Sequence, residues 1–328
     1  MADRYATSVM RAGPMATQEA ARILATGGLV AFPTETVYGL GADVTNGEAV
    51  ARLYAAKSRP AFNPLIAHVC DAAGARDVGD MNDDAKRLGA AFWPGPLTLV
   101  LPMKPGCAVS SLARAGLETV AVRVPDHAVA QSLLAAFGKP VVAPSANRSG
   151  HVSATNAAHV LADLDGRIDL IIDGGPSRAG LESTIVACLD GDPALLRAGA
   201  LARHLIEQAL GKPLRTDDGG GPHVPLSPGQ LASHYAPKAP LRLGATTVTP
   251  GEALLAFGDC LPVGSTQART ILNLSEKADL AEAAANLFSH LRQLDAADAD
   301  AIAVMPIPTH GLGEAINDRL RRAAAPRS

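Results

Sequence analysis

The sequence predicts an α/β protein with a larger and a smaller part. Short apolar runs typical of buried strands alternate with helical periodicities through the first two thirds of the chain. A stretch rich in glycine and proline, residues 216–240, interrupts the pattern, and strand and helix signals alternate again after it. We therefore expect a larger mixed α/β domain, a linker and a smaller α/β domain.

The first elements are marked by clear start and stop signals. Residues 18–26 have helical spacing and end at Gly27-Gly28, where glycine lets the chain leave a helix. Residues 29–32 form an apolar run that stops at Pro33, as expected for a buried strand.

A second helix is predicted from residue 45, where Thr45 and Glu48 have the spacing of a capping box. It should end near Lys57, because Pro60 excludes Arg59 from the α region. Further strands are predicted at 65–69, 97–101, 119–124, 141–143, 170–172 and 184–187, and further helices at 83–92, 128–137, 157–164 and 202–210.

After the glycine- and proline-rich stretch, strands are predicted at 254–257, 270–274 and 301–306, and helices at 280–294 and 314–323. This alternation favours a small parallel sheet with flanking helices. We place the larger domain at residues 1–213, the linker at 214–240 and the small C-terminal domain at 241–328.

Composition excludes several classes of protein. Lys+Arg 29 against Asp+Glu 32 gives a net charge of −3, and aromatic residues make up 3%, so a broad nucleic-acid-binding surface is not expected. No apolar run is long enough for a membrane span, and the N-terminus does not resemble a secretory signal. The four cysteines stand alone, which favours free thiols in a reducing cytoplasm and predicts no zinc or iron site.

Hydroxyl side chains follow the first predicted strand. In an extended chain Thr34 and Thr36 share a face and could bind a small polar ligand. An ST-turn that closes the strand explains the two residues equally well.

Basic residues follow the second predicted helix. Lys57 suits the helix C-terminus electrostatically, and with Arg59 it could also embrace a polyphosphate. His68 lies on the next strand, where packing is the commoner role of a histidine, although its closeness to Lys57 and Arg59 favours a site.

Arg123 shares one face of a predicted strand with Thr119 and Ala121. This face could be a pocket floor with an anion clamp, or an exposed face with Arg123 in water. A buried central strand would favour the clamp, since an unpaired buried arginine is too costly.

Small polar residues also occur at the ends of later strands, where α/β proteins often bind ligands. Ser145 follows one strand and Ser183 precedes another. Arg197 could reach a phosphate or cap an edge strand.

In the linker, Tyr235 follows His234 and could close over a pocket as a lid or pack against either domain. Trp93 is interpreted as a rigid corner of the core.

Six segments in this order resemble the YrdC-like threonylcarbamoyl-AMP synthase family in its longer, two-domain form. The segments are 33–41, 57–68, 93–98, 119–123, 143–147 and 182–185, with His234-Tyr235-Ala236-Pro237 in the linker. The resemblance implies a YrdC-like catalytic domain, a twisted mixed sheet with flanking helices, followed by a small C-terminal Rossmann-like α/β domain. It also implies a nucleotidyltransferase that makes L-threonylcarbamoyladenylate from L-threonine, bicarbonate or CO2, and ATP.

The resemblance also implies site residues. It implies contacts with L-threonine at Thr36, His68, Arg123, Ala143 and Ser183. It implies contacts with ATP at Lys57, Arg59, Asn63, Thr119, Ser145, Ser153, Arg197 and Tyr235, of which Lys57 and Arg59 are expected to be catalytic. Mg²⁺ is expected on the ATP phosphates.

The implied partner is a separate transferase complex that delivers the group to tRNA, giving N6-threonylcarbamoyladenosine. Direct tRNA binding has little support in the sequence. Two alternatives remain. One is a YrdC-like module that binds double-stranded RNA without catalysis, against which the net charge argues. The other is a carbamoyl-adenylate enzyme of hydrogenase maturation, whose zinc-finger cysteines this chain lacks.

Overall fold

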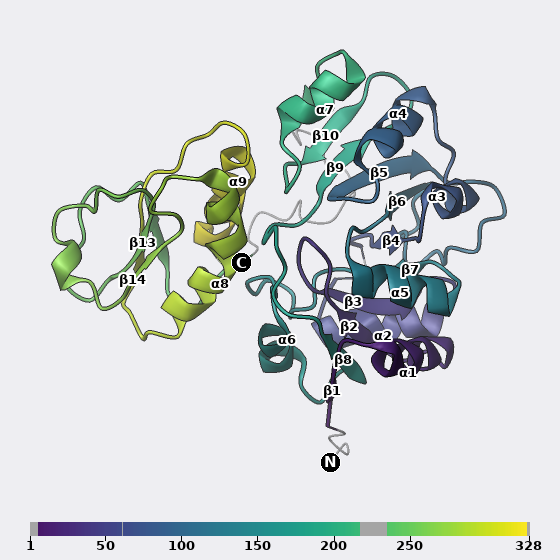
Figure 1. Ribbon diagram of the computed structural model, residues 1–328, viewed down its shortest axis with the longest axis horizontal. Coiled ribbons are helices and arrows are strands. Elements are labelled where there is room, and N and C mark those ends of the chain that lie inside the picture. Colours follow the sequence, from purple (N-terminus) through teal and green to yellow (C-terminus); the bar gives the residue numbers. More distant parts are fainter. Residues whose placement is uncertain (1–5, 61, 217–234, 327–328) are drawn as a thin grey trace.

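The computed structural model describes residues 6–60, 62–216 and 235–326 (Figure 1). An 11-stranded sheet forms the larger part, in the order β1-β8-β2-β3-β7-β4-β6-β5-β9-β10-β11. Parallel and antiparallel pairs both occur, so the prediction of a mixed sheet is confirmed. The strands are β1 Ser8–Arg11, β2 Val30–Phe32, β3 Gly39–Asp43, β4 Ile66–His68, β5 Leu97–Pro102, β6 Thr119–Arg123, β7 Val141–Val142, β8 Leu170–Asp173, β9 Thr184–Ala187, β10 Ala194–Arg197 and β11 Arg215–Thr216.

Helices cover the two faces of this sheet unequally. The helices are α1 Pro14–Ala25, α2 Gly47–Lys57, α3 Ala72–Val78, α4 Asp83–Phe92, α5 Ala128–Phe137, α6 Ala157–Leu164 and α7 Arg203–Leu210. One face packs against α2, α3, α4, α6 and α7 in the main core, and the opposite face packs against α1 and α5 beside β2, β7 and β8. On that second face, the small apolar cluster over β4, β6, β5 and β9 contains no helix residue. Among the described residues, no helix therefore covers this part of the sheet.

Local sequence explains how α2 begins and ends. Its N-cap is Asn46, whose side chain accepts hydrogen bonds from the backbone of Glu48 and Ala49 at 3.0 and 3.1 Å. The predicted capping box at Thr45 is wrong, because the Thr45 hydroxyl instead donates to the Asp43 carboxylate at 2.7 Å. The helix ends at Lys57 as predicted, and Ser58 takes the left-handed conformation that turns the chain.

Several elements were not predicted. These are β1, β3, α3, β10, β11 and a strand at Leu241–Leu243, and α1 begins at Pro14 rather than residue 18. Leu214 belongs to the main core and β11 pairs with β10, so the larger sheet reaches into the range predicted as linker.

The second sheet is entirely parallel, with the order β12-β15-β13-β14. Its strands are β12 Leu241–Leu243, β13 Ala253–Ala256, β14 Ile271–Asn273 and β15 Ile302–Val304; its helices are α8 Leu280–Asp295 and α9 Gly313–Ala324, with a 3-10 turn at Ser265–Gln267. This confirms the prediction of a small parallel α/β domain.

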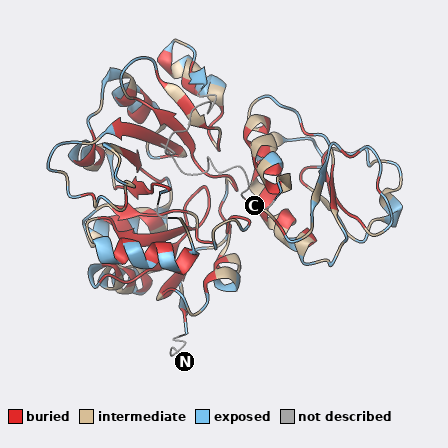
Figure 2. Ribbon diagram, turned by 180° about the vertical axis from the view of Figure 1, so that it is seen from behind, coloured by how far each residue is buried: buried red, intermediate tan, exposed pale blue. Residues whose placement is uncertain are grey.

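Both helices of the second domain lie on the side that faces the larger domain (Figure 1). Loop residues that include Ala245 and Val248 cover the other face of the small sheet. Figure 2 shows buried strands in both domains and helices whose outer sides are exposed. Within the described ranges, none of the helices has both the length and the apolar character needed to cross a bilayer.

Candidate active site

A hollow opens beside the part of the sheet that none of the described helices covers, and about 510 Å³ of it is unfilled by atoms. It lies where β4, β6 and β7 meet the segment after β2, the start of β9 and the end of β10. Most of its lining residues were predicted from the sequence. The lining consists of Thr36, Val37, Arg59, Ile66, His68, Arg123, Ala143, Pro144, Ser145, Glu182, Ser183, Arg197 and Tyr235.

The turn after β2 combines the two interpretations of its threonines. The Thr34 hydroxyl donates to the carbonyl of Val37 at 2.7 Å and lies 2.8 Å from the Thr36 hydroxyl. Thr34 therefore closes the turn, and Thr36 lines the hollow.

Strand register places His68 beside Arg123. The two residues are partners in the parallel pair β4 and β6, and Thr98 of β5 lies opposite Arg123 on the other side. Arg123 is 4% exposed, so the alternative of a solvated arginine is wrong. Its guanidinium lies 2.7 Å from the carboxylate of Glu35. This negative charge compensates the positive charge of the buried Arg123 side chain.

His68 is held neutral at the floor of the hollow. Burial, and secondarily Arg123, lower the pKa of His68 to about 3. Its Nδ1 lies 3.2 Å from the carbonyl of Ile66, and because a carbonyl only accepts, Nδ1 is assigned as the donor. This leaves Nε2 as the acceptor atom of an uncharged ring.

A hydrogen-bonded group links β5, β9 and β10 at one wall. The hydroxyls of Ser183 and Thr98 lie 2.7 Å apart, and Arg197 donates to the carbonyl of Ser183 at 2.8 Å through Nη2 and at 3.2 Å through Nε. Arg197 thus holds the segment before β9 and also lines the hollow.

Arg59 and Tyr235 complete the lining. The Arg59 Nη2 donates to the carbonyl of Pro64 at 3.3 Å, and its buried Nε has no hydrogen-bond partner among the residues described. Burial lowers the pKa of Arg59 to about 10. The Tyr235 ring is buried and stacks on Phe288 of α8 at 5.4 Å between ring centroids, so Tyr235 both lines the hollow and packs against the second domain. His234 lies outside the described residues.

The structure does not bring every predicted residue to the lining. The buried ammonium of Lys57 donates to the carbonyls of Ser145 and Asn147, so it supports the loop after β7 from within. Burial and the charge of Arg59 lower the pKa of Lys57 well below its ordinary value. Lys57 and Arg59 were predicted to bind one polyphosphate together. In the structure the Lys57 ammonium is instead directed to these carbonyls.

Ser153, Asn63 and Thr119 also lie away from the lining. The Ser153 hydroxyl donates to the carboxylate of Glu182 at 2.6 Å, one layer behind the hollow. Asn63 is buried, and its carbonyl accepts from the Tyr54 hydroxyl at 2.9 Å.

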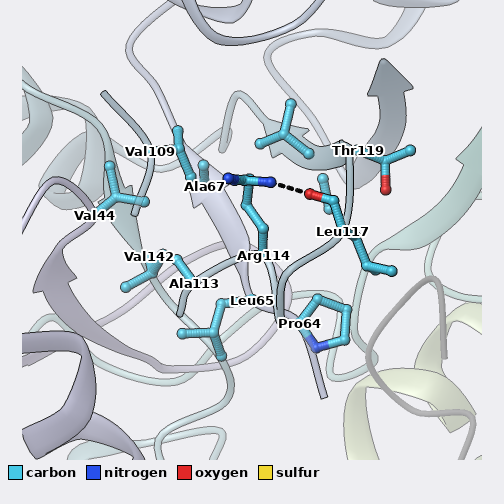
Figure 3. Close-up of a pocket in the computed structure, with 12 residues that line it drawn as sticks. Val44, Pro64, Leu65, Ala67, Val109, Ala113, Arg114, Leu117, Thr119 and Val142 are labelled. Carbon is cyan, nitrogen blue, oxygen red and sulfur yellow. Dashed lines mark hydrogen bonds between the residues drawn. The ribbon is translucent and has the colours of Figure 1, made fainter. Parts of the chain in front are cut away.

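Thr119 lies at a second, smaller cavity with about 280 Å³ of unfilled space (Figure 3). Apolar side chains such as Val109 and Leu65 line most of this cavity. Figure 3 also shows Arg114, whose guanidinium donates to the carbonyl of Leu117.

Two acidic residues of the site were missed. Glu35 stands between two threonines that were singled out, and Glu182 directly precedes Ser183. Burial alone would raise the pKa of Glu182, but Arg319 and Arg197 outweigh it and lower that pKa to about 2. The sequence signal that could have revealed them is a single carboxylate within an otherwise uncharged, apolar motif, because a buried carboxylate needs a partner. The partner of each glutamate comes from a distant element, which local patterns do not reveal.

Fold and hollow together define an α/β protein with a hollow on one sheet face, whose arginine and hydroxyl side chains suit a small anionic or zwitterionic ligand. The family model described as "Telomere recombination" (Sua5_yciO_yrdC) matches residues 22–199, and the model "Threonylcarbamoyl-AMP synthase, C-terminal domain" matches residues 201–325. The chain therefore belongs to the YrdC-like threonylcarbamoyl-AMP synthase family, in its two-domain form.

Individual relatives agree over nearly the whole chain. The threonylcarbamoyl-AMP synthase of Bacillus subtilis is 43% identical, covering 94% of this chain and 93% of the relative. The one from Pyrococcus abyssi is 39% identical, with 93% of each chain covered. The crystal structure of P. abyssi Sua5 with L-threonine superimposes with a TM-score of 0.88 and 35% identity, covering 97% of both chains.

Proposed function

We propose that this protein makes L-threonylcarbamoyladenylate from L-threonine, bicarbonate or CO2, and ATP, and releases pyrophosphate. Relatives that carry the name threonylcarbamoyl-AMP synthase support this reaction, as does the similar structure that holds L-threonine. The observation in this chain that carries the proposal is the convergence of Arg123, His68 and Ser183 with Arg59 and Arg197 on one hollow. An amino acid and a triphosphate both need such groups.

We assign L-threonine to the floor formed by β4, β6 and the segment before β9. The Arg123 guanidinium suits the carboxylate of the amino acid, and neutral His68 adds an acceptor without adding a second positive charge. The hydroxyls of Thr36 and Ser183 can select a substrate hydroxyl by hydrogen bonding, which discriminates better than an apolar wall does. Ala143 is small and leaves room for the ligand.

We assign ATP to the side of Arg59, Ser145, Arg197 and Tyr235. The Nε of Arg59 is buried and has no hydrogen-bond partner among the described residues, and it is a donor suited to a phosphate oxygen. Lys57 and Ser153 act behind the lining, Lys57 on the loop of Ser145 and Ser153 on Glu182. The family resemblance also implies nucleotide contacts for Asn63 and Thr119, but both lie outside the lining of this hollow.

The reaction needs no protein nucleophile. The deprotonated amine of threonine forms a nitrogen–carbon bond with CO2 and releases a proton to solvent. With bicarbonate, the amine proton and the hydroxyl group of bicarbonate leave together as water. A carbamate oxygen then bonds to the α-phosphorus while the bond from that phosphorus to the bridging oxygen breaks. The electron pair leaves with pyrophosphate. The side chains contribute by positioning both substrates and by stabilising the developing charge.

Magnesium enters this proposal as part of the substrate, MgATP. Glu35 and Glu182, the carboxylates at the site, are each paired with an arginine. No group of three metal-ligating side chains occurs within residues 6–60, 62–216 and 235–326. The described residues therefore do not fit a resident metal, and no step is routed through one.

The product is a reactive mixed anhydride, and a separate transferase complex that modifies tRNA is the proposed consumer. Described free cysteines fit a reducing compartment, so we place the reaction in the cytoplasm. We also propose the predicted division into a catalytic domain, a linker and a C-terminal domain. The packing of Leu214 in the main core and the pairing of β11 with β10 support a boundary after β11, slightly beyond the predicted residue 213.

The decisive experiment incubates the full chain with MgATP, bicarbonate and each amino acid in turn and measures pyrophosphate. We expect release with L-threonine that depends on bicarbonate. Equal release with all amino acids would contradict the assigned substrate. Salt-dependent binding of double-stranded RNA without ATP consumption would favour the RNA-binding alternative.

A further inference from the structure

One wall of the hollow is held by a residue of the other domain. Glu182 lines the hollow and is 7% exposed. Its Oε2 lies 2.9 Å from Nε of Arg319, which belongs to α9. Its Oε1 accepts from the hydroxyl of Ser153 at 2.6 Å. The Glu182 carboxylate is thus fixed by one group from each domain.

Arg319 contacts a second lining residue as well. Its guanidinium carbon lies 5.3 Å from the centroid of the Tyr235 ring, within the range of a cation–π contact. The same guanidinium donates to the carbonyl of Ala198 at 3.0 Å and pairs with Asp318 at 2.6 Å. The side chain is 0% exposed, so its charge persists only because these groups compensate it.

Close packing between the domains supports this arrangement. Gly180, two residues before Glu182, has a φ of 68°, and a Cβ at this position would lie 2.3 Å from the backbone oxygen of Ala284 in α8. The chain leading to Glu182 therefore lies directly against the second domain, and a shift of α8 and α9 would move this wall.

We propose that Arg319 is a positioning residue of the active site, through which the C-terminal domain fixes Glu182 and Tyr235 in the wall beside Arg59 and Arg197. The inference rests on the proposed function, because it assigns this side of the hollow to ATP. Arg319 is not itself among the lining residues; it acts through Glu182 and Tyr235.

The test compares Arg319→Gln with a matched control in the full chain. Arg203→Gln removes another ion pair between the domains, Arg203 with Glu314 at 2.5 Å, whose side chains are 26% and 32% exposed and lie outside the lining. We expect Arg319→Gln to raise KM for ATP about tenfold, the order expected for one lost hydrogen bond to a charged group. KM for L-threonine should change less than about twofold, and the control should change neither value.

If Arg319→Gln does not fold, Arg319→Lys replaces it in the test, because lysine keeps the positive charge. A purely structural role would lower the amount of active protein and leave both KM values unchanged, and that result would overturn the proposal. An equal rise in both KM values would also overturn it.

Amide hydrogen exchange supplies a readout that does not depend on activity. We expect faster exchange at residues 182–184 and 235–236 in the Arg319 variant and unchanged exchange there in the control. If the wild-type protein releases no pyrophosphate, the proposed function is wrong, and the exchange result alone decides whether Arg319 positions the wall. Unchanged exchange at both segments would then overturn the inference.

Discussion

The guanidinium of Arg123 lies 2.7 Å from the carboxylate of Glu35, and the two side chains are 5% and 2% exposed. Neither oxygen of Glu35 has an aligned hydrogen bond among the described residues, so the attraction is mainly between opposite charges. Removing one partner of such a pair leaves an uncompensated buried charge. Glu35 therefore matters for stability and for the orientation of Arg123.

We predict that Glu35→Gln lowers the free energy of unfolding by about 3 kcal/mol, the cost of leaving one buried charge unpaired. It should also raise KM for L-threonine, because Arg123 loses the group that orients it. Urea unfolding and pyrophosphate release measure the two effects. The double variant with Arg123→Gln should regain part of the stability but no activity. Wild-type stability in Glu35→Gln would show that the pair does not compensate the charge.

We predict that Arg59→Ala loses about 10²-fold in turnover, comparable to removal of one donor to a developing oxyanion. The thermal midpoint should change little, because the Arg59 hydrogen bond to the carbonyl of Pro64 is long, at 3.3 Å. Arg52→Ala serves as the control, since Arg52 pairs with Asp169 and is 47% exposed. Turnover close to wild type in Arg59→Ala would remove Arg59 from the ATP assignment.

Lys57→Met tests whether Lys57 acts on ATP or on the loop after β7. Methionine fills a similar volume but leaves the carbonyls of Ser145 and Asn147 without their donor. We expect the free energy of unfolding to fall by about 1–3 kcal/mol and KM for ATP to rise. Amide exchange at residues 145–150 should also become faster. Loss of turnover with unchanged exchange would instead indicate direct contact with ATP.

The sequence predicts elements whose signal is local and misses those that depend on tertiary pairing. Apolar runs revealed β5, β6 and β9, glycine marked the end of α1, and proline marked the end of α2. By contrast, β3 contains two glycines and an aspartate, residues of low strand propensity. It is a strand because β2 and β7 pair with it on both sides. No local pattern contains that information.

The same limit applies to the site. His68 and Arg123 were singled out on separate strands, and the parallel register of β4 and β6 brings them together. Lys57 and Arg59 are close in sequence, yet the left-handed turn at Ser58 separates their directions. Glu182 is understood only with Arg319, which is 137 residues away in the chain. Composition and spacing predict candidates, but partners depend on the fold.

The depressed pKa of His68 predicts an acid-dependent loss of stability. The unfolded chain takes up a proton on His68 near pH 6.5, and the folded protein does so only near pH 3. The unfolded state therefore binds more protons between these values, and stability falls as the pH is lowered through this window. The contribution is at most about 1.4 kcal/mol per pH unit.

His68→Gln should reduce the slope of the unfolding free energy against pH between pH 5 and 6.5, compared with the wild-type protein. Burial also lowers the pKa of His159, to about 4, but this residue is present in both proteins. Its contribution to the slope is therefore the same in both and does not affect the comparison. Identical slopes would mean that His68 takes up its proton in the folded state as well. Because folded His68 stays neutral near pH 6.5, it should add no step to the pH profile of kcat/KM there. The wild-type protein and His68→Gln should therefore have profiles of the same shape in this range.

The last prediction concerns the contact of Gly180 with α8. In Gly180→Ala the new Cβ would meet the backbone oxygen of Ala284, and the positive φ of 68° adds strain. Gly138→Ala is the matched control, because Gly138 has a φ of 71° and nothing within 4 Å of its Cβ position. Strain alone should cost both variants on the order of 1 kcal/mol.

Only Gly180→Ala should lose more stability than that and also raise KM for ATP, because displacing α8 moves the segment that carries Glu182. Urea unfolding and the KM measurements check both effects. Equal losses in the two variants would mean that the second domain tolerates the added methyl group and that the wall does not depend on this contact.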